Sequence, residues 1–128
     1  MSDKVGDDIL KICPSHHGLN TLGKNVQRFT SNDSIDHPVK TNTIDNLFLD
    51  TKIDLIKMDT EGSEYEILKV FDFKKFRPIV FTIEHNFTEL QFKIDELMKS
   101  NDYVRVFKKI TAFDAWYISK EVFDLLDK

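Results

Sequence analysis

The sequence predicts an α/β fold in which two buried parallel strands flank a helix and an antiparallel strand pair follows them. Residues 53–58 form a mostly apolar run that ends abruptly in acid and glycine, and residues 78–86 contain a second apolar run, with its strand at residues 79–84. Runs without a polar face are typical of strands that are covered on both sides in parallel sheets. Residues 103–107 and 114–118 look like strands a short connection apart, which indicates an antiparallel pair. Because a strand-helix-strand connection gives parallel neighbours, the first two runs are expected to lie side by side.

Length and composition indicate one globular domain and give no reason to expect a nucleic-acid partner. The chain has 128 residues, of which 41% are hydrophobic and 31% charged, and its formal net charge is -4. The 11 phenylalanines indicate a core built from large aromatic side chains. Lys74, Lys75 and Arg77 are interpreted as a solvated loop rather than as a basic binding surface.

Cysteine usage and hydropathy predict a cytoplasmic protein without a membrane partner. Cys13 is the single cysteine, so no internal disulfide can form, and a reduced compartment fits. Residues 1–8 lack the apolar core of a signal peptide. No run approaches the ~20 apolar residues that a membrane span needs.

The N-terminal part, residues 1–52, is expected to consist of strands and loops. Residues 9–13 form a short strand that ends at Pro14, and residues 39–43 can pair back with it. Residues 43–48 have the pattern of a short capped helical turn.

Two histidines, His16 and His17, lie in the loop after the first strand. Neighbouring imidazoles can bind a ligand or carry a proton. Such a pair is more often simply part of a polar loop, and we interpret it in that way.

Each buried strand is followed by a helix with its own start signal. Ser63 and Glu66 have the spacing of a capping box, in which each side chain satisfies a backbone amide at the start of the helix. Thr88 and Gln91 repeat this spacing before the second helix. Apolar residues then recur at helical spacing: Ile67, Leu68 and Phe71 in the first helix, and Leu90, Ile94, Leu97 and Met98 in the second.

Four polar side chains stand where the two buried strands end. Asp59 and Glu61 follow the first strand, and Glu84 and His85 end the second. Open α/β sheets bind ligands beyond the carboxyl ends of their parallel strands, and neighbouring strands lie roughly 4.8 Å apart. A single carboxylate of this kind more often caps a helix or pairs with a lysine. Four such groups at one edge favour a catalytic site, on which we expect them to converge.

A metal ion is an alternative occupant of this site. Asp59, Glu84 and His85 offer the carboxylate and imidazole groups that hold metal ions in proteins. Because nothing in their spacing requires a metal, we predict that the site works without one.

Residues 53–69, with the sequence IDLIKMDTEGSEYEILK, resemble the signature of the FkbM-family methyltransferases. Residues 18–22, 43–47, 77–86 and 113–117 resemble that family in the same order, so the resemblance spans residues 2–119. Members of the family use S-adenosylmethionine and often methylate hydroxyl groups of sugars or natural products. The resemblance therefore implies S-adenosylmethionine as the cofactor and a small-molecule or glycan acceptor.

The resemblance also implies a strand order. The family's sheet is Rossmann-like, and we predict a three-layer α/β domain. Residues 53–59 and 79–84 would be its central strands, followed in the sheet by residues 114–118 and then by residues 103–107.

Roles for the four polar residues follow from the reaction that the resemblance implies. Methyl transfer to a hydroxyl requires that the oxygen is held in line with the methyl carbon and that a base takes the proton. Asp59 is the first candidate for contacts with the substrate or the cofactor. His85 is the best general base because imidazole titrates near neutral pH.

The chain departs from the family because it lacks the strand and glycine-rich turn that hold the cofactor. Its glycines are Gly6, Gly18, Gly23 and Gly62, and no two of them form a G-x-G turn after a strand. Residues 1–128 therefore resemble the C-terminal half of a methyltransferase domain, a partial Rossmann-like sheet with residues 53–119 as its α/β core. No cofactor-binding residue can be assigned.

A non-catalytic role is the alternative, in which the truncated α/β module acts only by pairing with another chain. In the family, the strand at residues 53–59 pairs with the cofactor-binding strand that is lacking here, so its edge is expected to be open. Asp54 and Lys57 are the charges that protect residues 53–58, which is little for an open edge. We predict self-association, or a complementing chain, at this strand.

Overall fold

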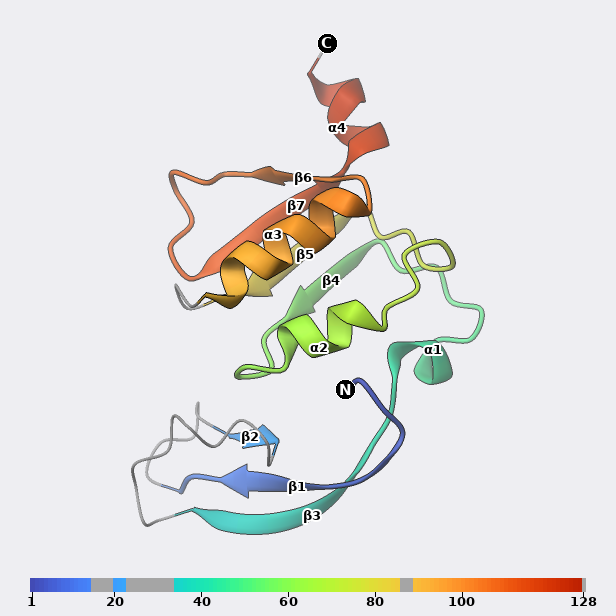
Figure 1. Cartoon of the computed structure of the whole chain (residues 1–128). Coiled ribbons are helices and arrows are strands. Elements are labelled where there is room, and N and C mark those ends of the chain that lie inside the picture. Colours follow the sequence, from blue (N-terminus) through green and yellow to red (C-terminus); the bar gives the residue numbers. More distant parts are fainter. Residues whose placement is uncertain (15–19, 23–33, 86–88, 128) are drawn as a thin grey trace.

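The computed structural model describes residues 1–14, 20–22, 34–85 and 89–127. Strands and helices are mixed along these ranges (Figure 1). In chain order the elements are β1 (Gly6–Ile12), β2 (Thr21–Leu22), β3 (Ile35–Thr41), α1 (Ile44–Leu47), β4 (Leu55–Met58), α2 (Glu64–Lys69), β5 (Val80–Glu84), α3 (Leu90–Ser100), β6 (Tyr103–Val106), β7 (Asp114–Ser119) and α4 (Lys120–Leu126).

The larger sheet has four strands in the order β4-β5-β7-β6. β4 and β5 are parallel, with Ile56 beside Phe81, while β5 and β7 are antiparallel, with Glu84 beside Asp114. β6 and β7 form the predicted antiparallel pair. This confirms an α/β fold with two parallel strands and a C-terminal antiparallel pair, in the strand order that the family resemblance implied. Among the described residues β4 is a terminal strand of the sheet and not a central one.

The N-terminal residues form a separate antiparallel sheet in the order β2-β1-β3. β1 and β3 pair along seven residues each, which confirms the predicted pairing and extends both strands beyond their predicted bounds. Pro38 lies inside β3, where it cannot donate a ladder hydrogen bond. Such a proline is tolerated because β3 is an edge strand of this sheet.

The hydrophobic core lies between the larger sheet and the helices α2 and α3, which sit side by side on one of its faces (Figure 1). Ile56 and Met58 of β4 are buried toward these helices. Leu55 and Lys57, which alternate with them along the strand, are exposed. Aromatic rings form the centre of the core, with centroids of neighbouring rings 4.8 to 5.9 Å apart: Phe71, Phe73, Phe76, Phe81 and Tyr103. The phenylalanine-rich core is therefore as predicted.

The third layer that we expected is not found among the described residues. The face of the sheet opposite α2 and α3 carries Leu55, which is 55% exposed, and the partly exposed Val80, Trp116 and Ile118. Strand residues alternate between faces, so these side chains cannot turn into the core. Among the described residues, the larger sheet and the helices α2 and α3 thus form two layers.

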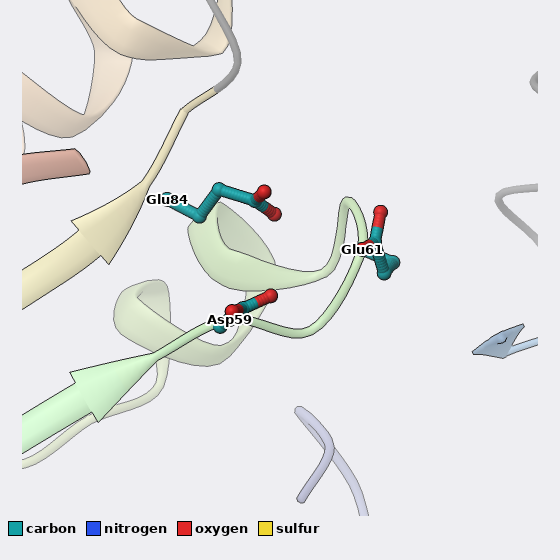
Figure 2. A group of neighbouring side chains, drawn as sticks. All are labelled: Asp59, Glu61 and Glu84. Carbon is teal, nitrogen blue, oxygen red and sulfur yellow. The ribbon is translucent and has the colours of Figure 1, made fainter. Parts of the chain in front are cut away.

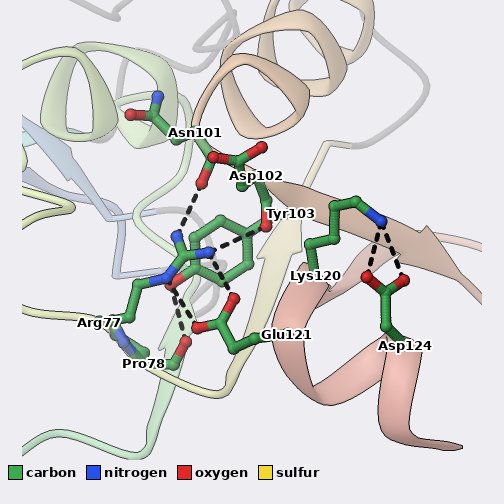
Figure 3. A network of polar contacts seen from close by, with 8 residues as sticks. All are labelled: Arg77, Pro78, Asn101, Asp102, Tyr103, Lys120, Glu121 and Asp124. Atoms are coloured by element: carbon green, nitrogen blue, oxygen red, sulfur yellow. Dashed lines mark hydrogen bonds and ion pairs between the residues drawn. The ribbon is translucent and has the colours of Figure 1, made fainter.

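Arg77 fastens the C-terminal helix to the sheet (Figure 3). Its guanidinium forms a fork with the Glu121 carboxylate, with N–O distances of 2.9 and 2.8 Å, and donates to the carbonyls of Asn101 and Asp102. It also lies 4.4 Å from the centre of the Tyr103 ring. The hydrogen bonds from Arg77 lower the pKa of Glu121 to about 2. The interpretation of Arg77 as part of a solvated loop is therefore wrong.

The predicted helices α1 and α2 form, but their predicted side-chain caps do not. The Ser63 side chain makes no capping hydrogen bond at the start of α2, so the capping box with Glu66 is not formed. Thr43 likewise makes no such bond at α1. The second capping box depends on Thr88, which lies outside the described residues. Among the helices that the structure describes, none combines the length and apolar character of a membrane span.

Candidate functional site

The site begins at the tight turn that follows β4. Asp59 leaves the strand, and the next residues turn the chain back toward α2 (Figure 2). Glu61 and Gly62 have φ angles of 55° and 108°, both in the left-handed region. Gly62 adopts this conformation readily because it has no Cβ, whereas Glu61 is strained by it. Strained non-glycine residues concentrate at functional sites, which is consistent with the predicted position of the site.

Glu64 holds this turn in place. Its carboxylate is 4% exposed and accepts hydrogen bonds from the Thr60 backbone amide (2.7 Å), the Thr60 hydroxyl (3.0 Å) and the Gly62 amide (3.0 Å). Buried carboxylates are costly unless donors surround them, and here three donors from one turn do so. The sequence analysis missed this residue. Its signal is a second acid two residues after the glycine, at the first position of α2.

Three of the four predicted side chains meet beyond the carboxyl ends of β4 and β5. One carboxylate oxygen each from Asp59, Glu61 and Glu84 lies within 4.8 Å of the other two (Figure 2). Asp59 is exposed and the other two are partly buried, so a solute can reach the group. The Nζ atom of Lys57 lies 3.4 Å from Oδ2 of Asp59 and forms an ion pair with it. The expected convergence is confirmed for these three residues, and their catalytic roles stay predictions.

His85 does not belong to this group of carboxylates. Its ring atom Nε2 lies 3.4 Å from Nη2 of Arg105, a residue of β6. The side chain is 5% exposed, and burial, followed by the positive charge of Arg105, lowers the pKa of His85 below its ordinary value. The expectation that His85 converges with the three carboxylates is therefore wrong, and so is the metal-binding set of Asp59, Glu84 and His85.

Arg105 is the centre of a second polar network, which is partly buried. Its guanidinium donates to Oδ2 of Asp95 at 2.7 Å, and the Tyr117 hydroxyl donates to the other oxygen of the same carboxylate. Burial and this hydrogen bond raise the pKa of Tyr117. Asp95 and Tyr117 come from α3 and β7, so the network ties the helix to the sheet beneath it.

The described residues do not by themselves form a cradle for S-adenosylmethionine. Gly6 and Gly62 are the glycines in the described ranges, and neither belongs to a G-x-G turn after a strand. The amide of Gly62 already donates to Glu64, so it is not available to a phosphate or carboxylate group of a ligand. Carboxylates in the position of Asp59 and Glu61 suit hydroxyl and ammonium groups instead. The predicted histidine pair, His16 and His17, lies outside the described residues.

Comparison with known proteins identifies the domain type. A family model described as the methyltransferase FkbM domain matches residues 8–105, which includes the strands β4 and β5 and the turn between β4 and α2. No curated protein and no solved structure shows a significant match to the chain.

Proposed function

Because the chain belongs to the FkbM methyltransferase domain family, we propose that it serves a methyltransferase that moves the methyl group of S-adenosylmethionine to a hydroxyl of a sugar or natural product. The observation that carries the proposal is the group of three carboxylates at the carboxyl edge of the parallel strands. Ligands of open α/β sheets bind at this edge. A glycan or other polyhydroxylated acceptor fits, since its hydroxyls can donate to several carboxylate oxygens at once.

In this proposal the carboxylates hold the acceptor and take its proton. Asp59 and Glu84 come from neighbouring strands, so an acceptor bound between them is fixed on two sides. Glu61 closes the third side from the strained turn. Fixing an oxygen in this manner supplies most of the rate gain available to a displacement reaction, and an adjacent carboxylate is within reach of the hydroxyl proton.

His85 takes a different role in the proposal from the one that sequence reasoning gave it. Its imidazole faces Arg105 and lies outside the group of three carboxylates. We infer that it positions the end of β5 and that the base is one of the three carboxylates.

The cofactor is proposed to bind mainly to residues outside the described part of the chain. The absence of a glycine-rich turn there supports the interpretation of this chain as the C-terminal half of a Rossmann-like domain. Such a chain would bind the cofactor weakly on its own. We also propose a cytoplasmic location, with which a single, buried cysteine agrees.

Activity can be tested with the chain joined to the N-terminal half of a family member. In that enzyme, Asp59→Asn and Glu84→Gln are expected to lower turnover by roughly 100-fold each, the usual contribution of an acid-base group. His85→Gln should lower it less. Glu66→Gln, an exposed acid on α2, is the control. Equal turnover in the Asp59 and Glu84 variants and the control would remove these residues from the site, while calorimetry on the isolated chain tests cofactor binding separately.

A second candidate function is pairing with another chain, and the free edge of β4 favours it. β4 is a terminal strand of its sheet among the described residues. The Val80 amide donates to the carbonyl of Asp54, so the backbone groups of Leu55 and Lys57 point away from β5. A groove of about 420 Å³ that Phe48, Ile53 and Leu55 help to line runs along this edge. Open edges of this kind accept further strands.

We expect this edge to cause self-association of the isolated chain, and Leu55→Lys to weaken it. A lysine at the exposed position 55 protects the edge without touching the core, unlike a change at the buried Ile56. The dissociation constant should rise about tenfold, as for a loss of ~1.4 kcal/mol. Light scattering over a concentration series measures it, with Leu126→Lys, at a more exposed leucine of α4, as the control. A parent chain that stays monomeric throughout argues against the pairing function.

A further inference from the structure

The connection between β6 and β7, residues 107–113, exposes three large apolar side chains. Phe107 is 52%, Ile110 79% and Phe113 60% exposed. We call this segment the hairpin tip. Concentrated apolar exposure of this kind on a soluble domain marks an interaction surface more often than scattered single residues do.

The hairpin tip is located at the same edge of the sheet as the three carboxylates. β7 runs antiparallel to β5, and Asp114, the first residue after the tip, is paired with Glu84. The His85 amide donates to the carbonyl of Phe113 at 2.9 Å. Whatever the tip binds is therefore brought close to the candidate active site.

The hairpin tip differs in the sign of its charge from the chain as a whole. The segment FKKITAF carries two lysines, Lys108 and Lys109, and no acid, whereas the whole chain has a net charge of -4. Both lysines are exposed. A local positive charge inside an apolar loop complements a surface that is anionic outside and apolar below.

Part of the backbone of the tip is hydrogen-bonded within the tip itself. The carbonyl of Phe107 accepts from the amides of Ile110 (3.0 Å) and Thr111 (3.1 Å) and from the Thr111 hydroxyl. Phe107 has a φ of 56°, in the left-handed region, and its ring meets Trp116 edge-on with centroids 6.1 Å apart. A self-bonded turn can enter an apolar medium at lower cost than an open loop, because fewer unpaired amides and carbonyls are desolvated.

We propose that the hairpin tip docks onto a lipid bilayer with anionic headgroups. Phe107, Ile110 and Phe113 enter the boundary between headgroups and acyl chains, while Lys108 and Lys109 contact the phosphates. The cytoplasmic face of a membrane supplies such a surface. The docking does not depend on catalysis. If the proposed methyltransferase function also holds, the acceptor is one that is presented at the membrane surface.

Vesicle flotation of the full chain tests the docking. The parent should float with vesicles of phosphatidylcholine and phosphatidylserine, and less of it should float with phosphatidylcholine alone. High salt should lower the fraction that floats with the vesicles that contain phosphatidylserine. Ile110→Ser with Phe113→Ser, and separately Lys108→Glu with Lys109→Glu, should each lower the partition coefficient about tenfold or more. Leu125→Ser with Leu126→Ser removes equally exposed apolar side chains from α4 and should change nothing.

Circular dichroism melts of each variant establish that it is folded, as expected for substitutions at exposed positions. Equal flotation of the parent and both tip variants, or no flotation at all, overturns the proposal. So does a result in which the tip variants change the molecular mass in light scattering but not the flotation, because the tip would then be a contact between protein chains.

Discussion

Replacing Glu64 by alanine is expected to lower the free energy of unfolding by about 2–4 kcal/mol, since three hydrogen bonds to a buried carboxylate are lost together. The amides of Thr60 and Gly62 would be left without their acceptor in a partly buried turn. The strained conformation of Glu61 also depends on this turn, so its relaxation should separate Glu61 from Asp59 and Glu84. Urea denaturation measures the loss of stability.

Two further variants sharpen this prediction. Glu64→Gln keeps one acceptor oxygen, so it should lose only about 1 kcal/mol. Glu66→Ala, two residues along α2, removes an exposed acid whose partner is Lys69 and should cost less than about 0.5 kcal/mol. If Glu64→Ala is no more destabilising than Glu66→Ala, Glu64 does not hold the turn.

Sequence reasoning located the turn but chose the wrong carboxylate for it. Ser63 and Glu66 match a common capping pattern, while the position of Glu64, two residues after Gly62, is a weaker signal. Which acid bonds to the turn depends on the backbone of Glu61 and Gly62, where two successive positive φ angles direct the amides toward Glu64. Only Gly62 hints at this in the sequence, because a left-handed conformation at a glutamate leaves no mark in composition or periodicity.

The position of His85 was predicted wrongly although the strand before it was predicted correctly. The end of β5 was predicted well, and Glu84 does join Asp59 and Glu61. Successive residues of a strand point to opposite faces, so Glu84 and His85 cannot both reach one ligand at the edge. His85 instead lies with Arg105, whose distance in the sequence gave no signal. Arg77 was misinterpreted for the same reason, because its partner Glu121 is 44 residues away.

The fold itself was easier to predict than the site. Apolar runs and alternation marked all four strands of the larger sheet, since these patterns reflect local burial. The order of those strands came from the family resemblance and not from the pattern. That the described residues form no third layer was not predictable in either way, because the apolar character of β4 and β5 fits a sheet covered on both faces.

Replacing Arg105 by methionine is expected to lower the free energy of unfolding by about 2–3 kcal/mol, since one partner of a largely buried ion pair is removed. The methionine fills much of the space of the arginine stem, so the loss reports the guanidinium rather than a cavity. Its partner Asp95 is 31% exposed, which lets water replace part of the interaction and limits the cost. Lys99→Met removes a positive charge from the exposed side of α3 and should change stability by less than about 0.5 kcal/mol.

The same variant should raise the pKa of His85. Burial and the charge of Arg105 both hold this pKa below 6.5 in the folded protein, so the unfolded chain binds a proton more readily. The resulting stability is complete above about pH 6.5 and falls as the pH drops toward the folded-state pKa. In Arg105→Met the charge of Arg105 is gone, while burial still lowers the pKa of His85 and the charges of Asp95 and Asp114 still raise it. The fall in stability should therefore be smaller, and an NMR titration of the His85 ring should shift upward. An unchanged titration would mean that the charge of Arg105 does not lower the pKa of His85.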